Sequence, residues 1–484
     1  MKNINRLIAL VLAMTVFACT DNFDEINTDP NEPTEIPAEN LFTQAQFSIA
    51  DEIWGRAMNF EFGMLMVQHF AQNEYAEDSR YNQTPSSFST PWQSFYSGTN
   101  ASPGGIIDLV VAKQLTEENE SLSEAVKNNR LAQIAIFKVL AFQTVTDIWG
   151  DIPYTEAFNP EEFPNPAYDL QSAVYAGMLS ELNDAIANIT PTAAGFGAGD
   201  IIYGGDMAMW GKLANSLKVR LGMRMADVDS GTAGTAVSQA FSSTLGVISS
   251  NDENALFQFD ADQRIANPFY VDKVVNNRDD FCITDVMVSD MEDRNDPRLD
   301  DYAAPNFNGE IVGLPYGLTD ADAFQLKPVS SRPHGSILEA TAPAKLLTYA
   351  EVEFFRAEAI ERGFISGSAA DAFNNAVEAS IKDWGGTEAE ATAYTTANPY
   401  DAANWEESIG YEKWVALYTQ GLEAWSEWRR LDEPSLVISA NAVSGVDRIP
   451  VRAFYPASEA EANSENLEAV DPGDMTTLLW WDVN

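Results

Sequence analysis

The residues best suited to bind a ligand in this chain are aromatic side chains that lie in loops beside amides and charged groups. An aromatic ring packs on the weakly apolar C–H face of a sugar, while amides and charged groups bind its hydroxyls. The candidates for such a ligand-binding site are Asn73, Tyr75, Arg80, Tyr81, Asn82, Asn267, Phe269, Tyr270, Arg278, Asp279, Tyr316 and Phe324. For each aromatic, the alternative is packing beneath its own loop.

Catalysis is not supported by any pattern of residues. The chain has only two histidines; His69 falls on an apolar helical stretch and His334 in a loop. It contains no Gly-x-Ser-x-Gly, phosphate-binding loop or His-Glu-x-x-His motif. Carboxylate pairs prove nothing among 73 acidic residues. We therefore predict no catalytic residues, no metal site and no cofactor.

One calcium alternative stays open. Asp227, Asp229 and Gly231 resemble part of a calcium loop, but their spacing departs from the EF-hand. A structural calcium ion therefore remains an alternative to the prediction of no metal. Cys282 lies between Phe281 and Ile283, which predicts a buried free thiol.

Charge and length narrow the class of protein. The 484 residues include 28 Lys and Arg against 73 Asp and Glu, which gives a net charge of −45. Unaided nucleic-acid binding is excluded, because phosphates would be repelled. Hydrophobic residues make up 45%, so the chain can bury a large core. The strong negative charge favours a neutral ligand over a polyanion.

The N-terminus predicts export and lipidation. Lys2 and Arg6 precede an apolar run that ends at Phe17, and Cys19 follows directly after a small residue. This arrangement resembles the bacterial lipobox, in which the cysteine is lipidated; an ordinary signal peptide is the alternative. We predict a signal peptide at 1–18 and a lipidated tether with an extended arm at 19–40. Acidic residues soon after Cys19 resemble the surface-export signal of Bacteroidetes lipoproteins.

Helical periodicity accounts for most of the remaining chain, 41–484, which we predict to be one domain. The predicted helices cover 41–70, 92–115, 121–147, 168–188, 205–226, 346–362, 368–384 and 409–430. Between them, we predict a long irregular region at about 229–345. Loops of this length inside a compact protein are usually functional. Alanines recur where late helices would touch, which resembles tetratricopeptide helix pairs.

Several segments, in order along the chain, resemble the SusD/RagB family of nutrient-binding lipoproteins, and its divergent second subgroup best. They are FDEINTDPN (23–31), WGDIPY (149–154), WGKLANSLKVR (210–220), LTYAEVEF (347–354) with AEA (357–359), RIPVR (448–452) with Pro456, and LWWD (479–482). Each segment is modest alone, but together they span nearly the whole mature chain.

This resemblance implies a mostly α fold, with about four tetratricopeptide-like helix pairs and an irregular ligand-binding region packed on them. It also implies a lipid-anchored protein of the outer membrane, exposed on the cell surface. Such a protein covers a SusC-type TonB-dependent transporter and delivers oligosaccharides to it. We expect a neutral glycan, such as a β-glucan. Peptide binding on the same fold is the first alternative, and a surface glycoside hydrolase is the weaker one.

Overall fold

The computed structural model describes residues 36–99, 103–470 and 472–483. The predicted signal peptide, Cys19 and most of the predicted arm lie outside the described residues. Within the described part, the chain from Ala38 onward forms one compact unit. The division into leader, tether and single domain stays a prediction.

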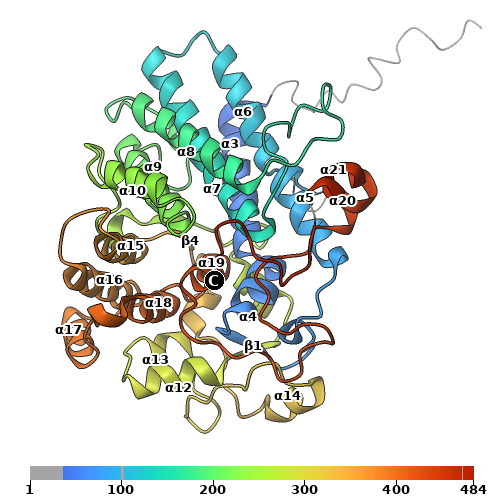
Figure 1. Cartoon of the computed structure of the whole chain (residues 1–484), viewed down its shortest axis with the longest axis vertical. Helices are drawn as coiled ribbons and strands as arrows, with labels where there is room; N and C mark the ends of the chain where they lie inside the picture. Colours follow the sequence, from blue (N-terminus) through green and yellow to red (C-terminus); the bar gives the residue numbers. More distant parts are fainter. Residues whose placement is uncertain (1–35, 100–102, 471, 484) are drawn as a thin grey trace, which may run out of the picture. The chain divides into compact units, whose positions relative to one another are not determined.

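Pairs of consecutive helices build the scaffold (Figure 1). The pairs are α7 (Glu124–Trp149) with α8 (Gln171–Asn188), α9 (Met207–Arg224) with α10 (Ser230–Phe241), α15 (Tyr349–Glu361) with α16 (Ala369–Asp383), and α18 (Trp405–Ala416) with α19 (Gly421–Leu431). Buried alanines such as Ala357 and Ala376 lie in these helices and permit close packing. The prediction of a mostly helical, tetratricopeptide-like fold is confirmed.

The first predicted helix is continuous only in part. It consists of α3 (Ala38–Trp54), a π-helical segment Arg56–Gly63 and the short α4 (Met64–Met66). The predicted helix over 92–115 is wrong, because α5 (Ser89–Ser97) and α6 (Ile106–Glu118) are separate. Gly104 and Gly105 have φ values of 122° and 107°, which a helix cannot contain.

The boundary of the irregular region also differs from the prediction. Helix α10 falls inside the segment predicted to be irregular, yet it packs on α9 as part of the scaffold. Buried Ala233, Val237 and Ala240 recur at helical spacing and were the signal for it.

Between α10 and α15 the chain is irregular and contains only short elements. These are β2 (Ala255–Phe257), α11 (Pro268–Tyr270), β3 (Phe281–Ile283), α12 (Asp285–Asp293), α13 (Leu299–Tyr302), α14 (Asp320–Leu326) and β4 (Ala344–Leu347). Strand β1 (Phe70–Gln72) pairs with β3, and β2 pairs with β4, both antiparallel. Later short helices are α17 (Glu388–Ala397), α20 (Ala457–Ala462) and α21 (Ser464–Ala469).

The predicted helix over 409–430 is also divided in two. Thr419 has a φ of 73°, and α19 begins anew at Gly421. Asn59 holds this break on both sides: its Nδ2 donates to the Thr419 carbonyl at 2.9 Å and its Oδ1 accepts from Gly421 N at 2.8 Å. The break therefore depends on a residue more than 350 positions earlier, which local periodicity cannot reveal.

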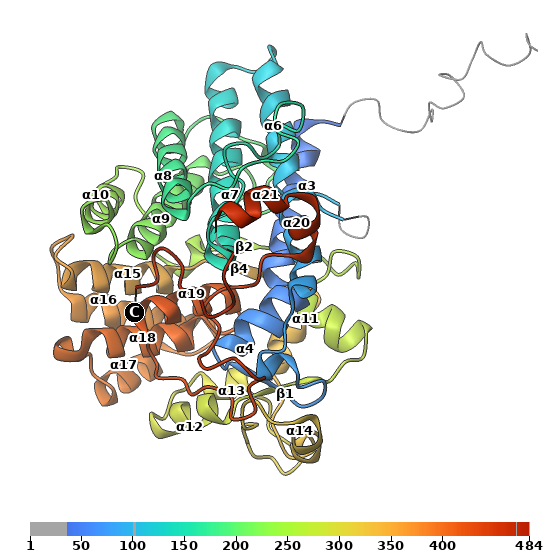
Figure 2. The same ribbon diagram turned by 45° about the vertical axis from the view of Figure 1, so that its right-hand side comes forward.

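Helix α7 runs through the core of the scaffold (Figure 2). It is the one helix in the described part of the chain that is long and apolar enough to cross a bilayer, and 78% of its apolar window is buried inside the protein. Trp149 at its end is fully buried, and its indole N–H donates to the Phe454 carbonyl at 2.9 Å. These features are those of a core helix.

Candidate ligand-binding surface

The β1–β3 pair brings two of the predicted loops together. In this antiparallel pair, Gln72 at the end of β1 lies opposite Phe281 at the start of β3. The loop that leaves β1 and the segment that enters β3 therefore start side by side, and Asn73 N donates to the Asp280 carbonyl at 2.8 Å. Residues 73–82 and 271–280, almost 200 positions apart, share one edge of this small sheet.

Tyr75 is the most exposed large hydrophobic residue of the first loop, with 63% of its surface accessible. Its φ of 53° places it in the left-handed region, which is uncommon for a bulky residue and typical of functional loops. The Arg278 guanidinium carbon lies 5.4 Å from the centroid of the Tyr75 ring. Arg278 is in turn paired with buried Asp280. The Tyr75 ring is therefore exposed to solvent, and the Arg278 guanidinium contacts one side of it.

A third segment, α14, completes the surface (Figure 1). Asp320 at its start accepts from Ala76 N at 2.6 Å. Lys327, just past its end, pairs with Glu74 at 2.8 Å. Both ends of α14 therefore contact the loop that carries Tyr75. Phe324 lies on this helix and is 59% exposed, so the two exposed rings belong to neighbouring segments.

Asp279 lies at the centre of the charges on this surface. Arg332 binds it through two hydrogen bonds of 2.9 Å, and Lys273 and Lys327 pair with it as well. Burial alone would raise the pKa of Asp279, but these hydrogen bonds and cations hold it well below its usual range. The carboxylate stays ionised and locks the three segments together. We call Tyr75, Arg278, Asp279 and Phe324 the loop platform.

Four predicted contact residues are buried, so we remove them from the proposed site. Tyr81 is 1% exposed, and its hydroxyl accepts from Ser439 N. Asn73 is fully buried and donates to the Cys282 thiol at 3.2 Å. Asn267 accepts from Phe269 N and so begins α11, and Phe269 stacks on a core ring at 3.9 Å between centroids. Polar neighbours in the sequence suggest exposure, but Asn267 binds the backbone of Phe269 and Ala342, and Asn73 binds the Cys282 side chain.

The other predicted residues lie around the platform or beneath it. Asn82 is exposed, and Arg80 is half-buried with its Nε donating to the Ala76 carbonyl. Tyr270 is half-buried. Tyr316 is also half-buried and packs against the Tyr81 ring at 6.3 Å. None of these presents a ring as openly as Tyr75 does.

Phe307 is a candidate that the sequence reasoning missed. It is 75% exposed, the highest value among the large hydrophobic residues of the described chain. Asn306 beside it donates to the Val329 carbonyl at 2.7 Å, which places this loop next to the segment that follows α14. An aromatic between two asparagines before Gly309 was the signal that could have identified it.

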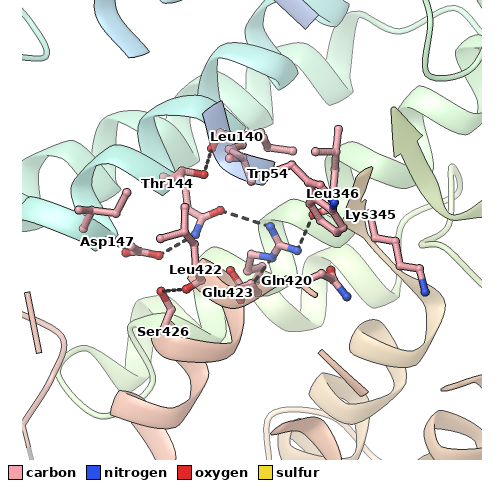
Figure 3. A pocket seen from close by; sticks show the side chains of 14 residues that line it. Trp54, Leu140, Thr144, Asp147, Lys345, Leu346, Gln420, Leu422, Glu423 and Ser426 are labelled. Atoms are coloured by element: carbon pink, nitrogen blue, oxygen red, sulfur yellow. Dashed lines mark hydrogen bonds and ion pairs between the residues drawn. The ribbon is translucent and has the colours of Figure 1, made fainter. Parts of the chain in front are cut away.

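Two cavities beneath the platform and in the neighbouring core are too small for a sugar, whereas a larger pocket of about 310 Å³ lies beside Asn267, Phe269 and Trp384. A cavity of about 30 Å³ lies beneath the platform, between Phe269 and Asp279. A second of about 30 Å³ lies in the core, where Trp54, Leu140 and Glu423 converge (Figure 3). Each has room for about one water molecule. A larger ligand must therefore bind on the outer surface of the platform or in the pocket beside Phe269.

The residues of the suspected calcium loop have other partners. Asp227 forms two hydrogen bonds with Arg362, and Asp229 caps α10 by accepting from Thr232 N. In the described ranges, no group of three or more His, Cys, Asp or Glu side chains could hold a metal ion. His69 is fully buried with its Nε2 donating to the Trp414 carbonyl, and Cys282 is a buried free thiol.

The fold and the platform together define a helical-repeat protein that presents exposed rings and charges on loops. Residues 30–456 match the family model described as "Starch-binding associating with outer membrane", the SusD-like family. The chain belongs to this family, as its sequence segments predicted. No curated protein matches it.

Solved structures show the same relationship. A chitin-binding protein has 27% identity and a TM-score of 0.81, with 92% of this chain and 100% of that chain covered. A SusD homologue from Bacteroides uniformis has 26% identity and a TM-score of 0.80, with coverages of 92% and 99%. A chitin-binding SusD homologue from Flavobacterium johnsoniae, at 21% identity, a TM-score of 0.72 and coverages of 91% and 99%, shares the fold.

Proposed function

We propose that this protein captures a neutral glycan on the loop platform and delivers it to a SusC-type TonB-dependent transporter. The observation that carries the proposal is the presentation of Tyr75: an exposed ring, held in a left-handed backbone conformation and braced by Arg278. A ring in that position can pack on a sugar face, while the neighbouring charged groups bind hydroxyls.

The ligand class follows from charge and from the relatives. The chain carries −45 overall, and the cations of the platform are already paired with Asp279 and Asp280. A polyanion would find no free counter-charge there. Similar structures include chitin-binding proteins, and chitin is a neutral β-linked glycan. We therefore propose a neutral β-linked glycan, with chitin-type oligomers and β-glucans as the two classes to compare.

Glycan binding is tested by titration calorimetry of the mature protein against chitin, laminarin, cellulose and starch oligomers. Tyr75→Ala combined with Phe324→Ala should abolish binding of whichever oligomer binds the native protein. Leu170→Ala is the matched control, since it removes a side chain that is 61% exposed outside the platform. Unchanged affinity in the double variant would overturn the assignment of the platform.

Anchoring and delivery need separate tests. We propose that Cys19 carries the lipid and that the protein lies on the cell surface, where it associates with the transporter. Cys19→Ser should release the protein from the membrane fraction and remove it from the surface of intact cells. Affinity purification from detergent-solubilised outer membrane should recover a barrel protein of the SusC type. Recovery of the native protein alone would argue against delivery to such a transporter.

Peptide capture remains the alternative ligand class on the same fold. It would be favoured if peptides, and no glycan, bound the native protein in the same titrations. Hydrolysis of glycans at the cell surface is the less favoured alternative function. Incubation of the bound oligomer with the protein, followed by product analysis, should show no cleavage.

A further inference from the structure

A pocket separate from the loop platform lies between the β2–β4 pair and the end of α16. Its volume is about 310 Å³, and its lining includes Leu256 of β2, Lys345 of β4, Asp301 of α13 and Trp384 directly after α16. None of the four residues of the loop platform lines it. Small-molecule sites span about 300–1,000 Å³, so this pocket fits a short ligand or the end of a long one. We call it the Trp384 pocket.

Trp384 is half-buried, and its contacts within the protein fix its position. The Lys345 ammonium lies 4.1 Å from the centroid of its ring, and the buried Tyr302 ring packs on it in a T-shaped arrangement at 4.8 Å. Asp383, the preceding residue, pairs with Lys345 at 2.5 Å. The indole therefore forms a rigid wall that needs no ordering when a ligand enters, which lowers the entropy cost of binding.

Two deeply buried residues of the Trp384 pocket have polar atoms without a partner. Thr419 is 2% exposed, Trp54 is 3% exposed, and both line the pocket. Within the described residues, the Thr419 hydroxyl and the Trp54 indole N–H form no hydrogen bond, and neither atom is closed to solvent. Trp54 also lines the core cavity shown in Figure 3. Polar atoms at such depth are normally paired, so the pocket wall has hydrogen-bonding capacity that the protein leaves unused.

Asp301 adds an acceptor to the same pocket. It is half-buried, and its carboxylate forms no hydrogen bond or ion pair with the residues that the structure describes. Burial raises its pKa, His334 opposes this rise, and Asp300 and Glu390 add to it. A ligand N–H that donated to this carboxylate would replace the water that burial removes. The pocket therefore lacks both donors and acceptors that a ligand could supply.

The rest of the lining shows which ligand would match these groups. Leu256, Ile337 and Pro343 form an aliphatic wall. A hydroxyl placed against that wall would lose its bond to water and gain none, whereas a methyl group loses nothing. The one cation in the lining, Lys345, is already paired with Asp383, so an anionic ligand would find no free counter-charge.

An acetamido group combines the three features that this lining requires. Its methyl fits the aliphatic wall, its N–H can donate to Asp301, and its carbonyl can accept from Thr419 or Trp54. A sugar with only hydroxyl groups has no apolar substituent for the aliphatic wall. The lining therefore favours an N-acetylated sugar over glucose.

We propose that the Trp384 pocket binds an N-acetylated sugar residue of the captured glycan through its acetamido group. The choice of a sugar rests on the proposed function, and the choice of an acetamido group rests on the lining of the pocket. Of the two ligand classes to compare, this site would select chitin-type oligomers over β-glucans.

The test compares two disaccharides that differ only in their acetamido groups, diacetylchitobiose and cellobiose. Calorimetry with the native mature protein should show that diacetylchitobiose binds more tightly by about tenfold or more. Ala342→Leu, which adds bulk to the lining, should abolish this binding. Asp301→Ala should weaken it by about tenfold, because one charge-assisted hydrogen bond is lost. Asp300→Ala is the control of equal charge change, since Asp300 is exposed and does not line the pocket.

Each contrary result overturns a different part of the inference. Equal affinity for cellobiose would refute the role of the acetamido group, and equal weakening by Asp300→Ala would reduce the effect of Asp301 to general charge. Unchanged binding in both pocket variants, with loss in the variant that lacks the Tyr75 and Phe324 rings, would place the disaccharide on the loop platform. Binding of neither disaccharide to the native protein would refute the pocket as a sugar site, while the longer oligomers still test the loop platform.

Discussion

Arg278 lies over the ring of Tyr75, with 5.4 Å between the guanidinium carbon and the ring centroid. The two residues come from loops that the β1–β3 pair joins, and Arg278 is held by Asp280 at the end of its own loop. The cation covers one side of the ring, while 63% of Tyr75 remains exposed. The contact thus orders an exposed aromatic before any ligand arrives, which lowers the entropy cost of binding.

Arg278→Ala should weaken glycan binding by about two- to fivefold, the value of an exposed cation–π contact. Asp280 keeps Arg56 as a partner at 2.8 Å, so the fold should be retained. Calorimetry with the bound oligomer measures the effect. Arg264→Ala is the control, because the Arg264 side chain is 86% exposed and its one ion pair among the described residues is with nearby Asp262. Full affinity in Arg278→Ala would show that the contact between Arg278 and Tyr75 has no role in binding.

Glu351→Ala should lower the free energy of unfolding by about 3–5 kcal/mol, because it removes the nearer carboxylate from the buried Arg220 guanidinium and leaves Glu423 at 3.6 Å. Arg220 binds Glu351 through two hydrogen bonds of 2.7 Å, and both side chains are almost fully buried. Urea denaturation monitored by tryptophan fluorescence measures the change. Lys382→Ala breaks an exposed pair with Glu378 and should leave the midpoint unaltered. A similar midpoint in both variants would contradict this account.

Gly421→Ala should destabilise the protein by about 1–3 kcal/mol through overpacking. A Cβ at this position would lie 2.5 Å from Met64 N, so either α19 or the start of α4 must shift. Gly335→Ala is the matched control, since an added Cβ there meets no atom within 4 Å. Thermal unfolding followed by circular dichroism compares the two. The order would be reversed if helix propensity, rather than close approach, governed the site.

His69 should make stability fall as the solution is acidified. Burial lowers its pKa to about 3, against about 6.5 in the unfolded chain, although the bond to the Trp414 carbonyl favours the proton. The unfolded state therefore gains a proton first, and stability is lost as pH falls from about 6.5 toward 3. From pH 7 to pH 5 this amounts to about 2 kcal/mol. Urea titrations at pH 7 and pH 5 measure this change in the free energy of unfolding, and His69→Gln should remove it. The same change in the variant as in the native protein would refute the assignment to His69.

Sequence periodicity predicted most of the helices because each buries one stripe of residues, a property that nearby positions encode. It failed where distant contacts decide the backbone. The break at Thr419 depends on Asn59, and the separation of α5 from α6 depends on two glycines with positive φ. In α10, the alanines were present in the sequence, but only their packing on α9 shows that the helix belongs to the scaffold.

The family, the helical scaffold, the negative charge and the aromatic-bearing loops can all be read from the sequence, because these features follow from composition and from short ordered segments. Which residues of those loops face solvent depends on tertiary packing. Tyr75 and Tyr81 lie six residues apart in the same polar loop, yet one is exposed and the other is covered by Ser439 and Tyr316. Exposure depends on which distant segment packs over a residue, and the sequence of a loop does not specify that segment.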